Sequence, residues 1–158
     1  MPRTATPDDA PDLVRLINHA YRVEDFFVHG DRVDLPGVLE RMSRPGGSFL
    51  VLDDPELGGP VATLFLEPHG LQGYFGLLAV HPDAQGRGLA RRLIAAAEDH
   101  FRQRGFAEMM IDVVTLRTEL FPFYAALGYE PRHTIPLDGR VALRIPAELR
   151  VMVKPLAG

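Results

Sequence analysis

Residues 74–105 constrain the fold more than any other part of the chain, because a strand, a glycine-containing turn and a helix follow one another there. Residues 74–80 carry no charge, which is typical of a strand buried on both faces. Pro82 ends this strand, since proline has no N–H to donate to a neighbouring strand. A helix is predicted next from apolar residues spaced four apart, which are Leu89, Leu93, Ala97 and Phe101. Its polar residues are expected to face mainly solvent, namely Arg91, Arg92, Glu98 and Arg102, and Gly105 is expected to end it.

The turn before this helix contains Gly86 and Gly88. The first N–H groups of a helix have no partner within the helix, and the helix dipole adds positive charge there. Because glycine has no Cβ, an anion can approach the backbone closely, so the turn is a candidate phosphate or pyrophosphate site. The alternative is a tight turn that binds nothing. A Rossmann fingerprint would need glycine at Arg91, and a Walker A loop would need Gly-Lys-Ser/Thr, so a nucleotide-binding protein of another class is disfavoured.

Composition bounds the class of protein. With 158 residues, of which 46% are hydrophobic, residues 1–158 are expected to form a single domain. The chain has no cysteine, so disulfides are excluded and a cytoplasmic location is expected. The net charge of −4 and the absence of long basic runs predict that the protein has no nucleic-acid partner. The uncharged runs are too short to span a membrane, so no membrane partner is predicted. The N-terminus lacks the apolar segment of a signal peptide, and no histidine pair has helical ligand spacing, so no metal site is expected.

The remaining pattern indicates a meander of antiparallel strands that leads into a βαβ unit. Helices are predicted within residues 4–21, 33–42 and 120–127, and strands over residues 48–52, 61–67, 109–114 and 150–154, with another beginning at Tyr129. Pro136, Gly139 and Pro146 interrupt residues 132–149, for which no long element is predicted.

Three segments carry a family resemblance. Gln85, Gly88 and Ala90 match the Q/R-x-x-G-x-G/A signature of the GNAT superfamily of N-acetyltransferases. Residues 78–82, Leu-Ala-Val-His-Pro, resemble the end of that family's fourth strand, and residues 123–129 resemble its FYxxLGF segment. The resemblance spans the chain, most weakly at both ends. It implies an α/β fold, an α+β sandwich in which flanking helices cover a mixed, largely antiparallel sheet with a central βαβ cofactor-binding unit.

The resemblance also implies the reaction, which is transfer of an acetyl group from acetyl-CoA to an amine by direct attack in a ternary complex. The absence of cysteine fits this route, because no cysteinyl intermediate is available. Backbone groups of Leu78, Ala79 and Val80 would bind the pantetheine arm and thioester. The pyrophosphate would be held by N–H groups of the turn, formed by Gln85, Gly86, Arg87, Gly88, Leu89 and Ala90. Arg87 would add charge to this site, or else be an exposed loop arginine.

Tyr124 lies where the family often places a tyrosine that protonates the departing thiolate, and the alternative is a tyrosine of the core. Two positions depart from the family pattern. Gly76 stands where a glutamate base is common, and Arg117 stands where many members have an asparagine that contacts the cofactor. The candidate replacement bases are Glu24, Asp25, Glu67 and His69, each of which is otherwise a surface group.

Residues 21–27 combine acidic and aromatic side chains in a connecting segment, as substrate-facing loops often do. The acceptor site is therefore predicted to include Tyr21, Glu24, Asp25 and Phe27, with Glu24 recognising the ammonium group or relaying its proton. The alternative is that Phe26 and Phe27 fill the core while the charges keep the loop soluble. The acceptor is expected to be a small-molecule amine or a peptide or protein amine, and the protein a monomer or homodimer. A non-catalytic acyl-CoA sensor is the competing function, which Gly76 favours and Tyr124 disfavours.

Overall fold

The computed structural model describes residues 1–137 and 142–156. Within them, a seven-stranded sheet has the strand order β1-β3-β4-β5-β6-β9-β7, and β2 pairs with β8 separately. The strands are β1 (Arg3–Thr4), β2 (Val28–His29), β3 (Ser48–Asp54), β4 (Gly59–His69), β5 (Gln72–Val80), β6 (Glu108–Val114), β7 (Glu130–Pro136), β8 (Ala142–Leu143) and β9 (Glu148–Pro155). The helices are α1 (Ala10–Ala20), α2 (Leu35–Ser43), α3 (Leu89–Gln103) and α4 (Leu120–Ala126). Short 3₁₀ turns are η1 (Pro7–Asp9), η2 (Tyr21–Glu24) and η3 (Pro82–Ala84).

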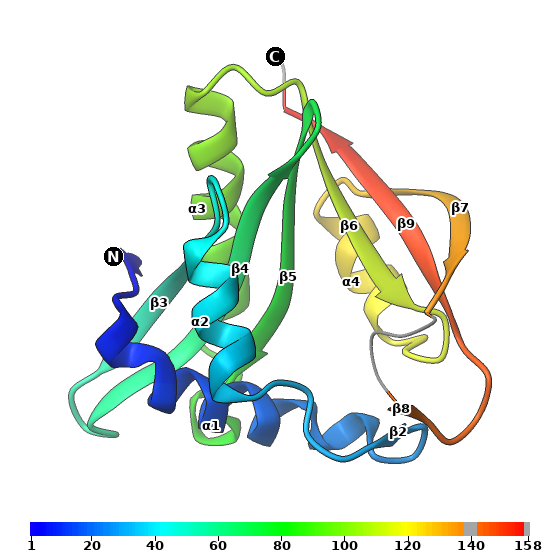
Figure 1. Ribbon diagram of the computed structural model, residues 1–158. Coiled ribbons are helices and arrows are strands. Elements are labelled where there is room, and N and C mark those ends of the chain that lie inside the picture. The colour runs from blue at the N-terminus through cyan, green and yellow to red at the C-terminus, as the bar shows by residue number, and fades with distance from the viewer. Residues whose placement is uncertain (138–141, 157–158) are drawn as a thin grey trace.

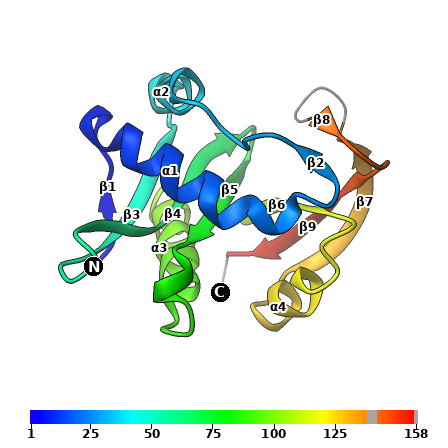
Figure 2. The same ribbon diagram turned by 90° about the horizontal axis from the view of Figure 1, so that it is seen from below.

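Helices cover both faces of the sheet (Figures 1 and 2). One core lies under α1 and α2 and includes Leu13, Ile17 and Phe65. The other lies under α3 and α4 and includes Leu93 and Phe101. Among the strands of the described residues, only β5 and β6 pair in parallel, and α3 connects them. The predicted fold class, a mixed and largely antiparallel sheet with a central βαβ unit, is confirmed.

The sheet opens between its two central strands. β5 and β6 pair only at Gly73–Met109 and Tyr74–Met110, and beyond these residues the strands part, as Figure 1 shows. The pairing of β4 with β5 shifts register between Thr63 and Phe65 of β4, and this shift marks a bulge on β5. Within the bulge, Leu77 has a left-handed backbone conformation, with φ of 52°. The sequence predicted a strand buried on both faces, but residues 76–78 are only partly buried, because this edge of β5 faces a cleft instead of a neighbouring strand.

The apolar face of α3 is packed as predicted, with Leu89, Leu93, Ala97 and Phe101 all buried. Gly105 follows the helix in the left-handed conformation, with φ of 82°, as its predicted role at the helix end requires. The arginines of the polar face are exposed, but the prediction for Glu98 is wrong, since this residue is only 7% exposed. Both carboxylate oxygens of Glu98 lie 3.0 Å from Lys154 Nζ, and one accepts a 2.8 Å hydrogen bond from the Tyr129 hydroxyl. These partners come from the far end of the chain, so helical periodicity alone did not reveal them.

The ends of the chain differ from the sequence prediction in smaller ways. Arg3–Thr4 forms an edge strand on β3 that was not predicted, and α1 begins only at Ala10, after the 3₁₀ turn η1. Within residues 132–149, the structure extends β7 to Pro136 and forms β8 at Ala142–Leu143. The predicted break at Gly139 lies outside the described residues.

Candidate active site

A single elongated cleft of about 930 Å³ runs along the opened edge of β5. One end is formed by the turn before α3, the middle by β5, β6 and α4, and the other end by α2, η2 and the adjoining ends of β4 and β5. The cleft therefore joins the predicted cofactor-binding segments to a second end that has room for another molecule.

The turn at the first end has the conformation that its sequence suggested. Gly86 and Gly88 have φ of 80° and 74°, which is the left-handed region that favours glycine. A Cβ at either position would meet nothing within 4 Å, so the space above this backbone is open. The cleft is lined here by Leu78, Ala79, Val80, Gln85, Gly86, Gly88, Leu89 and Ala90, all predicted to bind the cofactor.

Arg87 is placed differently from the other predicted cofactor residues. It does not line the cleft, and its Nη1 lies 2.6 Å from Asp54 Oδ2 at the end of β3. Arg91, one turn into α3, lines the cleft instead, with its guanidinium 5.5 Å from the centroid of the Phe123 ring. The pairing of Arg87 with Asp54 favours the alternative of an exposed loop arginine, and Arg91 is the arginine that lines the cleft.

Tyr124 lies on α4 at the middle of the cleft and is 7% exposed. Burial raises the pKa of its hydroxyl above the ordinary phenol value. Within the described residues, this hydroxyl makes no hydrogen bond to another residue, whereas every buried side-chain polar atom has a partner. The Tyr124 hydroxyl must therefore be accessible from the cleft, although its ring packs near Phe75 and Tyr129.

Tyr74 occupies the space above Gly76. The two residues lie two apart on β5 and so face the same side of the strand. A Cβ added at Gly76 would stand 2.4 Å from the Tyr74 hydroxyl oxygen, much closer than real contacts allow. This hydroxyl donates a 3.1 Å hydrogen bond to Asp112 on β6, across the opening between the strands. A tyrosine–aspartate pair thus lies beside Gly76, the position at which a glutamate base is common in the family that this chain resembles.

The residues expected to bind the acceptor separate into two groups. Tyr21 and Glu24 line the cleft. Burial raises the pKa of Tyr21 to about 12, and the Arg32 guanidinium lies 5.1 Å from the centroid of its ring. Glu24 is only 3% exposed, and its two oxygens are bound by Arg32 at 3.0 Å and by Arg117 at 2.7 Å. Each oxygen already has a guanidinium partner, which favours a structural role for Glu24, and its role in ammonium recognition or proton relay stays a prediction.

Asp25 and Phe27 do not line the cleft. Asp25 is exposed, 3.8 Å from Arg22, and Phe27 is fully buried in a cluster with Val114 and Leu149. The prediction that these two residues contact the acceptor is therefore corrected. The physical reason is that the turn of residues 25–27, which follows η2, directs one side chain to solvent and the other into the core.

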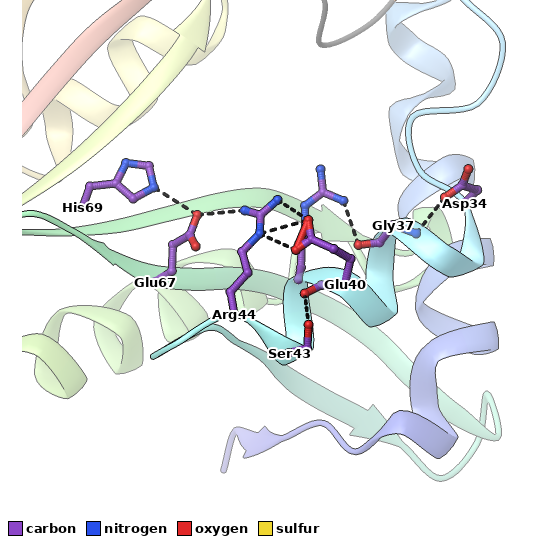
Figure 3. Close-up of polar contacts among 8 residues, drawn as sticks. Asp34, Gly37, Glu40, Ser43, Arg44, Glu67 and His69 are labelled. Atoms are coloured by element: carbon purple, nitrogen blue, oxygen red, sulfur yellow. Dashed lines mark hydrogen bonds and ion pairs between the residues drawn. The ribbon is translucent and has the colours of Figure 1, made fainter.

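The two other candidate bases lie at the far end of the cleft. Glu67 Oε2 lies 3.1 Å from Arg44 Nη1 and 3.0 Å from His69 Nε2 (Figure 3). The His69 ring stacks on Tyr74, with centroids 4.2 Å apart and planes at 6°. Glu67 Oε2 is thus bound by two groups at this end of the cleft.

Sequence reasoning missed Tyr74, Asp112, Arg41 and Arg91 as cleft residues. One signal was available for Asp112, which is the only charged residue in the interior of an otherwise apolar strand. The spacing of Tyr74 and Gly76 was a second signal, because residues two apart on a strand share a face.

Within residues 1–137 and 142–156, no group of three histidine, aspartate or glutamate residues is arranged to hold a metal ion. No helix in the same residues is both long and apolar enough to cross a membrane.

An opened parallel strand pair, a glycine turn at a helix start and one continuous cleft are the features that the resemblance to the GNAT superfamily implied for an acyltransferase that uses acetyl-CoA. The sequence model of the acetyltransferase (GNAT) family matches residues 11–129, and the chain belongs to this family. The family reaction is transfer of an acetyl group from acetyl-CoA to an amine. The predicted family, reaction class and cosubstrate are thereby confirmed at the level of the family.

Relatives and solved structures agree with this assignment. A mycothiol acetyltransferase of Nocardia farcinica is 31% identical over 93 residues, which cover 56% of this chain and 31% of that protein. N-alpha-acetyltransferase 30 of Schizosaccharomyces pombe is 30% identical over 105 residues, which cover 63% of this chain and 70% of that protein. The PaiA N-acetyltransferase of Thermoplasma acidophilum, in complex with coenzyme A, shares the fold with a TM-score of 0.77 at 14% identity, over 98% of both chains. This chain matches less than a third of the length of the Nocardia protein, and its own acceptor does not follow from these names.

Proposed function

We propose that this chain performs the family reaction in the cleft and that acetyl-CoA and the acceptor amine occupy its two ends together. The backbone of Leu78, Ala79 and Val80 would hold the pantetheine arm, because this edge of β5 is not paired with β6. The turn of residues 85–90 would hold the pyrophosphate on its backbone N–H groups, with Arg91 supplying the nearby positive charge. The main support for this proposal is that the open glycine turn lines the same cleft as Tyr124 and Tyr74, whose hydroxyl groups can take part in the reaction.

We assign the base to the pair of Tyr74 and Asp112. The ammonium group of the acceptor would give one proton to the Asp112 carboxylate, either directly or through the Tyr74 hydroxyl, and become a neutral amine. The amine lone pair then attacks the thioester carbonyl carbon. As the C–N bond forms, the C–S bond breaks and the electron pair of that bond leaves on sulfur. The nitrogen then loses its second proton, which ends on the thiolate, so the products are the N-acetyl amide and the free thiol of coenzyme A.

Tyr124 would stabilise the departing thiolate. Burial raises the pKa of Tyr124, so its hydroxyl stays protonated and remains a hydrogen-bond donor. Complete proton transfer to a thiolate whose ordinary pKa is about 8.5 would be uphill for this phenol. We therefore propose that Tyr124 acts mainly by donating a hydrogen bond to sulfur, a narrower role than the full proton donor expected from the sequence.

Several further expectations remain proposals. We retain one acetyltransferase domain over residues 1–158, a cytoplasmic location, and a monomer or homodimer that acts on a small-molecule, peptide or protein amine. The competing function is an acyl-CoA sensor. The accessible hydroxyl of Tyr124 and the carboxylate of Asp112 favour turnover over sensing, because binding alone needs neither group.

The test is a thiol-release assay with acetyl-CoA and a panel of amines, amino acids and peptides. Turnover that depends on the amine, with the acetylated product identified by mass spectrometry, is the expected result. Tight acetyl-CoA binding with no thiol release above that of buffer, across the whole panel, would favour the sensor instead.

A further inference from the structure

Positive charge gathers at the acceptor end of the cleft. Arg32, Arg41 and Arg44 all line this end, and they come from the segment before α2, from α2 itself and from its C-terminal cap. The Arg44 guanidinium lies 5.8 Å from the centroid of the Phe65 ring, and Phe65 is the cross-strand partner of Gly76. These cations therefore lie over the same part of the sheet as Tyr74 and the missing base.

Two of the three guanidinium groups already have carboxylate partners. Arg32 is bound to Glu24 at 3.0 Å. Arg44 lies between two acids, with Nη2 2.7 Å from Glu40 and Nη1 3.1 Å from Glu67, as Figure 3 shows. Their positive charge is thus largely balanced within the protein.

Arg41 differs from both. Its only hydrogen bond within the described residues is a 3.2 Å contact from Nη1 to the carbonyl oxygen of Gly37, one turn earlier in α2. No carboxylate oxygen of those residues lies within 4.0 Å of its guanidinium, since it takes part in no ion pair there. Arg41 is also half-buried, and burial together with Arg44 lowers its pKa. A partly desolvated cation without a counterion is unfavourable, so an anionic ligand at this point would be stabilising.

Resting on the proposed function, we infer that the acceptor is a small amine that also bears a carboxylate group, such as a free amino acid, and that Arg41 binds this carboxylate. An arginine is suited to the task because its planar guanidinium can donate two parallel hydrogen bonds to one carboxylate. At the other end of the acceptor, Asp112 would attract the ammonium group. Glu67 would not repel the ligand strongly, since Arg44 and His69 bind its oxygen.

The test compares each amino acid with its amide, which has the same shape without the negative charge. Phenylalanine, leucine and glutamine are assayed beside their amides for kcat/KM with the wild type and with Arg41→Gln. Binding of the same pairs to the complex with coenzyme A is measured by calorimetry, which does not depend on turnover. Because hydrogen bonds to a charged group contribute about 1.5–3 kcal/mol, the wild type should prefer at least one acid over its amide by about 10- to 100-fold, and Arg41→Gln should remove this preference.

Two further variants make the result specific. Arg44→Gln removes the neighbouring guanidinium that balances Glu40 and Glu67, so the preference for the acid should fall, but less than in Arg41→Gln, because no direct contact with the ligand is lost. Arg15→Gln removes an exposed arginine of α1 that pairs with Asp12, so the preference should not change. Equal loss in Arg41→Gln and Arg44→Gln would overturn the assignment to Arg41, and a wild type that binds amides or peptide amines as well as acids would overturn the carboxylate-bearing acceptor. Acid-selective binding that depends on Arg41 but occurs without turnover would support this inference while refuting the proposed transferase function.

Discussion

The hydroxyl of Tyr74 on β5 donates a 3.1 Å hydrogen bond to the carboxylate of Asp112 on β6, at the point where the two strands part. The same hydroxyl fills the space that a side chain at Gly76 would occupy. The chain therefore lacks a glutamate at position 76 but has a carboxylate and a phenol beside that position, one from each of the separating strands. The first prediction therefore concerns the carboxylate of Asp112.

Asp112→Asn should lower kcat strongly, because the amide cannot accept the ammonium proton. General-base catalysis contributes about 10²–10⁴-fold, so a loss in that range is expected in a chemistry-limited assay. Asp99→Asn on the exposed side of α3 is the matched control, with wild-type kcat expected. Unchanged kcat in Asp112→Asn would remove this residue from the mechanism.

Tyr124→Phe keeps the ring in place and deletes the hydroxyl that reaches the cleft. A hydrogen bond to the charged thiolate contributes about 1.5–3 kcal/mol, so kcat should fall by about 10- to 100-fold while the dissociation constant of acetyl-CoA stays the same. Because burial raises the pKa of Tyr124, the wild-type enzyme should show no loss of rate from its ionisation near pH 10, about the ordinary value for a phenol. Rapid-mixing kinetics of thiol release measure both effects. A variant with wild-type kcat would make Tyr124 a core residue only.

Arg91 and Arg87 lie at or near the cofactor turn, and their alanine variants can be compared directly for coenzyme A binding. Arg91→Ala should weaken coenzyme A binding by about 10-fold or more, because a cation that faces the phosphate site is removed. Arg87→Ala should have a smaller effect, since Arg87 is paired with Asp54 outside the cleft. Calorimetric titration with coenzyme A at two salt concentrations tests this, and only the Arg91 variant should lose part of the salt dependence. The reverse order of the two variants would return the phosphate role to Arg87.

Glu24→Ala should destabilise the fold, since it leaves the buried guanidinium groups of Arg32 and Arg117 without their shared carboxylate. Removal of one partner from a buried ion pair costs about 3–5 kcal/mol, which urea unfolding can measure. Asp25→Asn changes the exposed neighbour and should alter the free energy of unfolding by no more than about 0.5 kcal/mol. If Glu24→Ala unfolds like the wild type and only raises the KM of the acceptor, Glu24 is a substrate-binding residue after all.

The features that the sequence determined are those that depend on neighbouring residues. The apolar spacing from Leu89 to Phe101 defined α3, and Gly86, Gly88 and Gly105 marked its two ends. These predictions succeeded because helix periodicity, caps and turns arise from interactions within a few residues. The same local pattern carried the resemblance through which the family and its cosubstrate were predicted.

Only the tertiary structure decided which charged and aromatic groups face the cleft. Glu98 was expected in solvent but meets Lys154 and Tyr129, and Phe27 was expected in the acceptor site but fills the core. The pairing of Tyr74 with Asp112 likewise depends on the register and the separation of two strands. The physical reason is that the partner of a polar side chain is set by long-range packing and strand register. Residues as far apart as Glu24 and Arg117 form an ion pair that leaves no trace in the local sequence pattern.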